Sequence, residues 1–537
     1  MKNGPEQIFS EYRSGKGFKS ALGSKGLYEQ SKVNERFYSG DQWYGAKCGN
    51  DRPLVRYNLI KRIGDYKMSV LLSSDADIAF FAEGIPATNA TKKRVEQIRF
   101  LVAAGQSAGF ENSEEEIALV TSALNDYHKI AAKRLKIDAL LEQALKNAYI
   151  SGTGVIYSFW DSEIPTGLYV DDNREIPIKG DVKSEVIDIE NVYFGDPECP
   201  SVQSQPYIII ASCWGVDELK RYAVRFGASA SAAEGIRPDS INGNKATVLT
   251  KLYKKYSPDG KSYKIYAKMV SENAVIREEW DIGVRKYPLS VFRWETRKGC
   301  AYGESEITYL IPNQIAVNRM LTSGVWSAMS SGMPTLVVNG DVVDGEITND
   351  PGQIIKVFGS GEDVANALRF VSPPDYSGNF QSIIGPLVEN TLAQSGANPA
   401  ALGDVDPDNT SAILTLRNAA MLPLKMLQNR YYEFMEEVAD IWAEFWITQY
   451  GSRRLKIEDE NGVWYMPFDG DRYRDLIICA NASVTAPDNF DTDARVKILD
   501  RLLERGDITL EQYLRRLPSG MLKDADELIR SVRGAAQ

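Results

Sequence analysis

The chain has 537 residues, of which 43% are hydrophobic and 25% are charged, a globular composition in a chain too long for a single core. Its net charge of −11 disfavours tight, sequence-independent binding to nucleic acid or to an anionic membrane, and its single histidine excludes sites that need two. Five scattered cysteines without a C-x-x-C pair indicate a reducing environment, and no stretch reaches the roughly 18 apolar residues that a membrane span needs.

The first hundred residues open with a polar and aromatic stretch, which a helical segment follows. Leu59, Ile63 and Val70 recur at helical spacing, which predicts an amphipathic helix over 58–73. A long helical region from about 113 to 150 follows and ends at the glycine-containing run SGTG at 151–154.

The segment from Gly154 to about Thr296 changes towards a period of two, with β-branched and aromatic runs that predict a mostly antiparallel sheet. One hairpin is well marked, because predicted strands 247–256 and 262–270 flank a turn that contains Pro258 and Gly260.

Two helices with few charges are predicted next, over 302–334 and from about 379 to 394, and they bracket a short strand-rich insert. A very long helix is predicted from about 410 to 448, where Pro423 predicts a kink. Two or three short helices are expected over 489–537.

Acidic charge is concentrated in residues 302–408, which hold three basic and thirteen acidic residues, a balance of −10. The two weakly charged helices lie in this region. Helices so poor in charge are difficult to solvate one by one, so we expect them to pack against copies of the same chain.

Several residues have both a functional and a structural interpretation. Asp404, Asp406 and Asp408 alternate as in a calcium loop, but the glycine and glutamate positions of that motif hold Asn409 and Thr415, which favours a solvated acidic loop. The run GESEI at 303–307 lacks the closing glycine of a nucleophile elbow, so Ser305 is interpreted as a helix cap.

The aromatic residues and the histidine are interpreted as structural. We expect His128 to be partly exposed and without a catalytic role. The tryptophans of the strand-like runs are expected to pack in the core rather than to stack on bases; they are Trp160, Trp214, Trp280 and Trp294. Trp326 lies in a weakly charged helix, where we expect it to pack between subunits.

Four phrases, in this order, carry a family resemblance that covers most of the chain. They are FYSGDQW at 37–43 before the helix that starts with Asn58, SGTG at 151–154, DIENVYFGDP at 188–197, and YGESEI at 302–307 before a helix with Asn313, Gln314 and Asn318. Together they resemble the portal (head–tail connector) proteins of tailed double-stranded-DNA bacteriophages.

The resemblance implies an α+β portal-like fold with wing, stem, clip and crown regions. Residues 1–301 would form the wing, 302–333 the first stem helix, 334–378 the clip, 379–396 the second stem helix, 397–409 the tunnel loop, 410–488 the long kinked helix and a returning wing segment, and 489–537 the crown.

The resemblance also implies a non-enzymatic protein without a cofactor or metal: a homo-oligomeric ring of about twelve subunits at one capsid vertex of the virion, assembled in the host cytoplasm. It would pass double-stranded DNA non-specifically during packaging and ejection. Its partners would be the terminase large subunit, a head-completion adaptor, and capsid and scaffold proteins, with no membrane.

Two sets of residues are the candidate sites. The DNA-facing tunnel loop would use Asn398, Leu402, Gly403, Asp404, Asp406, Asp408 and Asn409, and the clip that docks terminase and adaptor would use Asp341, Asp344, Glu346 and Asp350. An acidic wall suits sliding, because lysine or arginine would pin DNA phosphates. The absence of a Walker-type phosphate loop means that any ATP-driven motor is a separate protein.

Two alternatives stay open. Another virion structural or adaptor ring protein would share the acidity and the oligomerisation. A carboxylate-based hydrolase is the second, although no motif places two carboxylates together.

Overall fold

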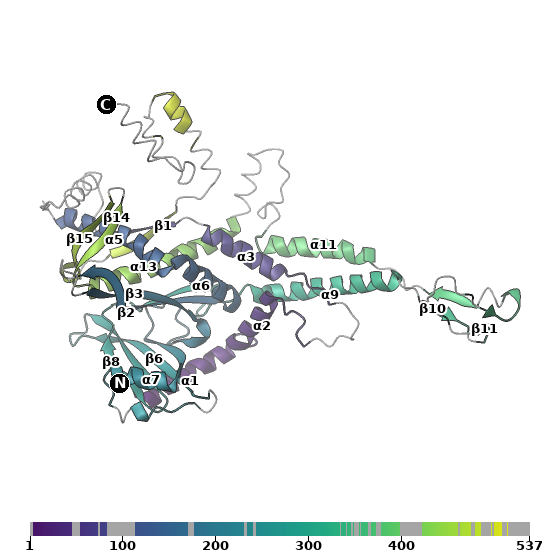
Figure 1. Cartoon of the computed structure of the whole chain (residues 1–537), viewed down its shortest axis with the longest axis horizontal. Helices are drawn as coiled ribbons and strands as arrows, with labels where there is room; N and C mark the ends of the chain where they lie inside the picture. Colours follow the sequence, from purple (N-terminus) through teal and green to yellow (C-terminus); the bar gives the residue numbers. More distant parts are fainter. Residues whose placement is uncertain are drawn as a thin grey trace.

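The computed structural model shows an α+β molecule with a body of helices and sheets and one long projection (Figure 1). It describes residues 4–45, 54–73, 76–82, 113–169, 177–229, 233–239, 243–332, 335–339, 341–344, 347, 354, 356–362, 367–371, 377–397, 422–459, 462–473, 478–484, 496, 499–506 and 513.

Helices and strands are interspersed along the chain. The helices are α1 (Pro5–Ala21), α2 (Leu27–Ser39), α3 (Leu59–Leu72), α5 (Ser113–Leu135), α6 (Ile137–Ser151), α7 (Val216–Arg225), α9 (Ile307–Gly332), α11 (Ser377–Gln394), α13 (Lys425–Gln449) and α14 (Gly470–Tyr473), with 3-10 turns at Ile189–Asn191 and Leu422–Leu424. The strands are β1 (Ala76–Ala82), β2 (Thr153–Tyr169), β3 (Pro177–Asp188), β4 (Val192–Phe194), β5 (Tyr207–Gly215), β6 (Lys245–Tyr256), β7 (Tyr263–Ser271), β8 (Val275–Asp281), β9 (Leu289–Arg293), β10 (Thr335–Val338), β11 (Val343–Asp344), β12 (Lys356–Val357), β13 (Leu368–Val371), β14 (Ser452–Asp459), β15 (Gly462–Asp469) and β16 (Ile478–Val484).

Two antiparallel sheets build the β-rich part of the body, as the sequence predicted. One has the strand order β4-β5-β6-β7-β8 and the other β3-β2-β9. The marked hairpin is β6–β7, and Gly260 in its turn has a φ of 69°, which favours glycine. Helix α7, between β5 and β6, interrupts the predicted run of strands.

Two features differ from the helical interpretation of the N-terminal half. The long helical region divides into α5 and α6 at Lys136, whose φ of 51° is left-handed. Strand β1 pairs with β16, so that Ala76 lies opposite Val484 and two segments far apart in the sequence form one antiparallel sheet. Neither feature has a local breaker or turn signal.

Helix α13 forms the centre of the core. It contacts β2, β3, β9 and β16, and its Phe434, Trp442 and Trp446 are almost fully buried. Pro423 lies in the 3-10 turn immediately before α13, and the part of the predicted kinked helix that precedes Leu422 lies outside the described residues.

A buried carboxylate joins α13 to α5 and β3. Asp181 on β3 accepts hydrogen bonds from the hydroxyls of Tyr127 at 2.8 Å and Tyr450 at 2.7 Å, and it pairs with Arg134. Burial raises the pKa of both tyrosines, so both hydroxyls keep their protons as donors. The network satisfies a charge that would otherwise be costly to bury.

Helices α9 and α11 lie side by side and project from the body (Figure 1). We call this pair the projecting hairpin. At its far end are two small antiparallel ladders, β10–β13 and β11–β12. The order of a weakly charged helix, a strand-rich insert and a second weakly charged helix agrees with the sequence prediction.

Candidate functional site: the projecting hairpin

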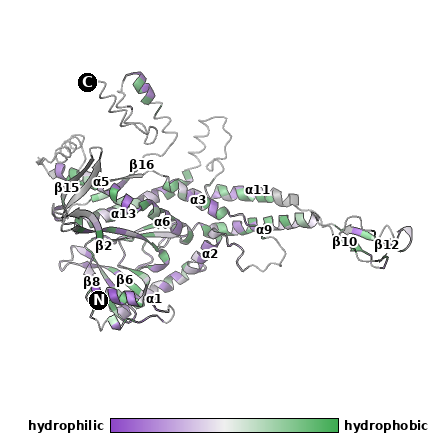
Figure 2. Ribbon diagram, in the orientation of Figure 1, coloured by the Kyte–Doolittle hydropathy of each residue, from purple (hydrophilic) through white to green (hydrophobic). Residues whose placement is uncertain are grey.

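The surface of the projecting hairpin is unusually apolar for a part that extends away from the body. Arg319 is the only charged residue of α9, and Glu389 is the only one of α11. Green hydrophobic residues run along both helices in Figure 2. Five large hydrophobic side chains on the hairpin are at least 37% exposed: Tyr309, Val325, Trp326, Met329 and Ile383. Such a surface is typical of a protein–protein contact.

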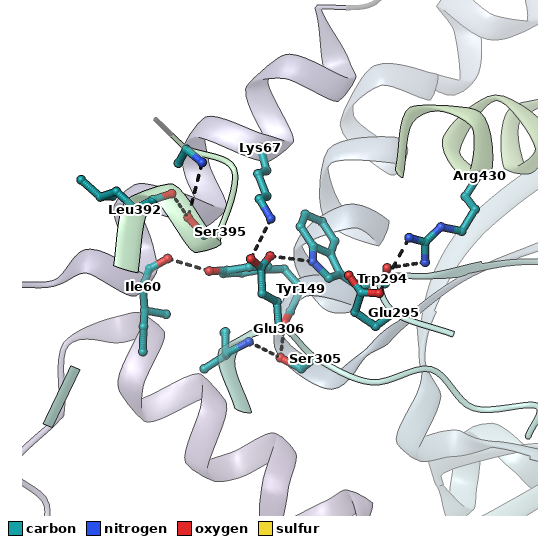
Figure 3. A network of polar contacts seen from close by, with 12 residues as sticks. Ile60, Lys67, Tyr149, Trp294, Glu295, Ser305, Glu306, Leu392, Ser395 and Arg430 are labelled. Carbon is teal, nitrogen blue, oxygen red and sulfur yellow. Dashed lines mark hydrogen bonds and ion pairs between the residues drawn. The ribbon is translucent and has the colours of Figure 1, made fainter. Parts of the chain in front are cut away.

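The base of α9 is fixed to the body by a buried ion pair (Figure 3). The Lys67 ammonium on α3 lies 2.7 Å from the Glu306 carboxylate, and their side chains are only 9% and 12% exposed. The second oxygen of Glu306 accepts a hydrogen bond of 3.0 Å from the indole N–H of Trp294. Both carboxylate oxygens therefore have a buried donor.

Ser305 supports the start of the same helix. Its hydroxyl oxygen accepts a hydrogen bond of 3.1 Å from the backbone N–H of Ile307, and the hydroxyl donates to the carbonyl of Tyr149 (Figure 3). This geometry agrees with the helix-cap interpretation of Ser305. The Tyr149 hydroxyl donates in turn to the Ile60 carbonyl at 2.8 Å. Burial raises the pKa of Tyr149, and the nearby Glu306 carboxylate raises it further.

Gln314 and Asn318, which belong to the resemblance phrase, have a clear structural role. The Gln314 amide oxygen accepts from the backbone N–H groups of Leu59 at 2.9 Å and Ile60 at 3.3 Å. These N–H groups are at the start of α3, where a helix leaves its donors unpaired. Asn318 accepts from the backbone N–H of Tyr57 at 3.1 Å. One face of α9 thus caps α3.

The two helices of the hairpin are also joined to each other. The Asn313 amide donates to the Thr391 hydroxyl at 3.1 Å, across the pair. Near the end of α11, the Ser395 hydroxyl donates to the Leu392 carbonyl at 2.8 Å (Figure 3). These bonds lie on the body side of the hairpin, close to the anchor of α9.

Helix α13 reaches the same region through Arg430. Its guanidinium donates to the carbonyl oxygens of Trp294 at 2.6 Å and Arg293 at 3.3 Å, and it lies 3.9 Å from the Glu295 carboxylate (Figure 3). Because Trp294 also donates to Glu306, polar contacts run from the hairpin base to the core helix α13.

Sequence reasoning missed the anchor residues Lys67, Trp294 and Arg430 as a group. One signal was present: Lys67 occupies the same helical stripe as Ile60, Ile63 and Leu71, all of which are buried. A lysine on the apolar face of a helix indicates a buried partner. Its partner Glu306 is too distant in sequence to be identified from the pattern.

The predicted tunnel-loop residues Asn398, Leu402, Gly403, Asp404, Asp406, Asp408 and Asn409 lie outside the described residues, as do Glu346 and Asp350. Of the predicted clip residues, Asp341 and Asp344 lie at the tip of the hairpin. Asp341 is exposed, and Asp344 is opposite Lys356 in the β11–β12 ladder.

The remaining predictions concern single residues. Of the four tryptophans predicted to pack in the core, Trp294 is fully buried, and Trp160, Trp214 and Trp280 are half-buried and pack against core clusters. Trp326 is 37% exposed on the hairpin. His128 is partly exposed, and its ring lies 5.5 Å from those of Phe80 and Trp442, which agrees with a structural role.

The described ranges lack two kinds of feature. They contain no group of three or more histidine, cysteine, aspartate or glutamate side chains arranged to hold a metal ion. Within the same ranges, no helix has the combination of length and apolar character that crossing a bilayer requires.

Comparison with known proteins gives matches among solved structures alone. No protein-family model and no curated protein matches the chain. Among solved structures, the chain is similar to one from the virion of a native gene transfer agent particle, with 9% identity over 94% of this chain and 98% of that one and a TM-score of 0.35. A TM-score this low does not establish a shared fold, so the match supports none of the proposals below.

Proposed function

We propose that this chain is the subunit of a portal ring, a structural conduit for double-stranded DNA at one capsid vertex. The observation that carries the proposal is the exposed apolar surface of the projecting hairpin, whose two helices hold one charged residue each. In a ring, the hairpins of neighbouring subunits would cover these surfaces. The order of sequence phrases that resemble portal proteins supports the same assignment.

In this proposal each part of the chain has a mechanical role. The body, with residues 1–301, is the wing, and the projecting hairpin supplies both stem helices. The tip within 334–378 is the clip that docks the terminase large subunit and later the head-completion adaptor. Residues 397–409 form the tunnel loop, and 489–537 form the crown.

The proposed action on DNA is passive. A ring of about twelve subunits with an acidic channel repels phosphates weakly and evenly, so the duplex slides without being held. The polar contacts at the hairpin base would transmit forces between stem and wing. The chain itself would catalyse no reaction, and the motor would be the partner ATPase. Capsid and scaffold proteins would surround the wing during assembly in the host cytoplasm.

The position of the chain in assembled particles tests this function. Particles that carry a tagged copy are labelled with gold and imaged, and the packaged DNA is measured in parallel. We expect label at a single vertex, and empty heads when the chain is omitted. Label spread over the shell would contradict the portal role and favour a capsid subunit. Full heads that lack tails would favour an adaptor.

A further inference from the structure

A groove lies between α5, the start of α6, and α13. It has a volume of about 640 Å³. Its floor is apolar and comes from separate elements: Ile78 of β1, and Met435, Val438 and Trp442 of α13. Strand β1 contacts both α5 and α13 and contributes Ile78 to the lining.

The rim of the groove is basic. Lys129, Lys133 and Lys136 all line it and all are exposed, whereas Asp138 is the only acidic residue among its described lining residues. Lys129 and Lys133 are four residues apart on α5, which places them on one helix face about 6 Å apart.

The backbone at Lys136 gives a second, independent observation. Among the described residues it is the only non-glycine with a positive φ, at 51°. This left-handed conformation is unfavourable for a residue with a Cβ, and glycine or asparagine usually occupies it. Strained backbone positions of this kind cluster at functional sites, and Lys136 lies at the rim of the groove.

We propose that this groove binds an acidic amphipathic helix of another protein. The apolar face of the helix would lie on the half-buried Ala132, Ile137 and Met435, and carboxylates spaced by one helical turn would face Lys129, Lys133 and Lys136. Many proteins bind a helix in a groove with a hydrophobic floor and charged edges. The floor supplies affinity, and the charged edges select the orientation of the helix.

The shape and composition of the groove favour a helix over nucleic acid. DNA phosphates would use the lysines but would leave the apolar floor uncovered, and base stacking would need exposed aromatic faces, whereas Trp442 is fully buried. The groove is formed within one chain, so a test of its binding needs no assembled ring.

The test uses the full chain and a synthetic helix of about 18 residues, with leucine at positions i, i+3, i+4 and i+7 and glutamate beside them. Binding of the fluorescent peptide is measured by anisotropy at low and moderate salt. We expect binding that weakens with salt, and a loss of roughly tenfold or more in the variant K133E/K136E. Met435→Glu, which places a charge on the floor, should weaken binding at every salt concentration.

A matched control has the same change in net charge at a distance. Lys261 and Lys298 are exposed and do not line the groove, so K261E/K298E should bind like the wild type. Circular dichroism and the melting temperature establish that each variant is folded. The proposal is overturned if the wild type does not bind the acidic helix, if a lysine-substituted version of the peptide binds equally well, or if both double variants lose affinity equally. Tighter binding of a short DNA duplex that depends on Lys133 and Lys136 would also overturn it.

Discussion

The buried pair between Lys67 and Glu306 should behave as a unit that anchors the projecting hairpin. Both side chains are close to fully buried, and their 2.7 Å separation is that of a charge-assisted hydrogen bond. Removing one partner leaves the other charge buried without compensation, which costs about 3–5 kcal/mol. We therefore expect Lys67→Met and Glu306→Gln each to lower the free energy of unfolding by about 3 kcal/mol.

The double variant K67M/E306Q should recover most of this loss. It removes both charges, keeps the side-chain volumes, and leaves an amide oxygen that can still accept from the Trp294 indole N–H. We expect it within about 1 kcal/mol of the wild type, so the two single effects are strongly non-additive.

Urea unfolding followed by tryptophan fluorescence measures the cycle, because Trp294 contacts the pair directly. Calorimetry on the same samples shows whether the hairpin and the body unfold together. Single variants that each cost less than about 0.5 kcal/mol, or a double variant that costs their sum, would refute the role of this pair as the anchor.

Three further predictions follow from other parts of the chain. Trp326→Glu places a charge on the exposed surface of the hairpin and should prevent assembly while the melting temperature of the body stays unchanged; size-exclusion chromatography and calorimetry check this. Lys136→Gly relieves the left-handed strain and should stabilise the chain by up to about 1 kcal/mol in urea unfolding, while binding of the acidic peptide weakens; a loss of stability would show that the strain argument is wrong. The double change D404K/D406K should leave assembly intact but reduce DNA packaging, because lysines in the tunnel loop would hold phosphates; a wild-type packaging yield would remove the sliding argument.

Elements with local signals were predictable from the sequence. The helix α3 follows from the spacing of Leu59 and Ile63, and the β6–β7 hairpin follows from the turn that contains Gly260. The order of the projecting hairpin was predictable too, because a near absence of charge along two helices is visible without coordinates. The break between α5 and α6 in the body was not predictable, because it falls at Lys136, a residue type that does not indicate a left-handed turn.

Features that depend on distant residues were not predictable. The pairing of β1 with β16 joins segments near opposite ends of the chain, and no local pattern specifies such a partner. The anchor was not predictable for the same reason. Lys67 stood out on the apolar face of α3, but only the fold brings Glu306 close to it, with Trp294 bonded to the same carboxylate. Gln314 and Asn318 were named by resemblance alone, and their role as a cap for α3 is visible only in three dimensions.

The most direct test of the portal assignment is to count and image the subunits. Native mass spectrometry of the purified full chain, alone and after co-expression with its capsid proteins, gives the number of copies, and electron microscopy of the same samples gives the symmetry. The account predicts a closed ring of about a dozen copies with a central channel, in which the projecting hairpins of neighbours lie against each other. A chain that stays monomeric or dimeric under both conditions, with the hairpin exposed, would contradict it.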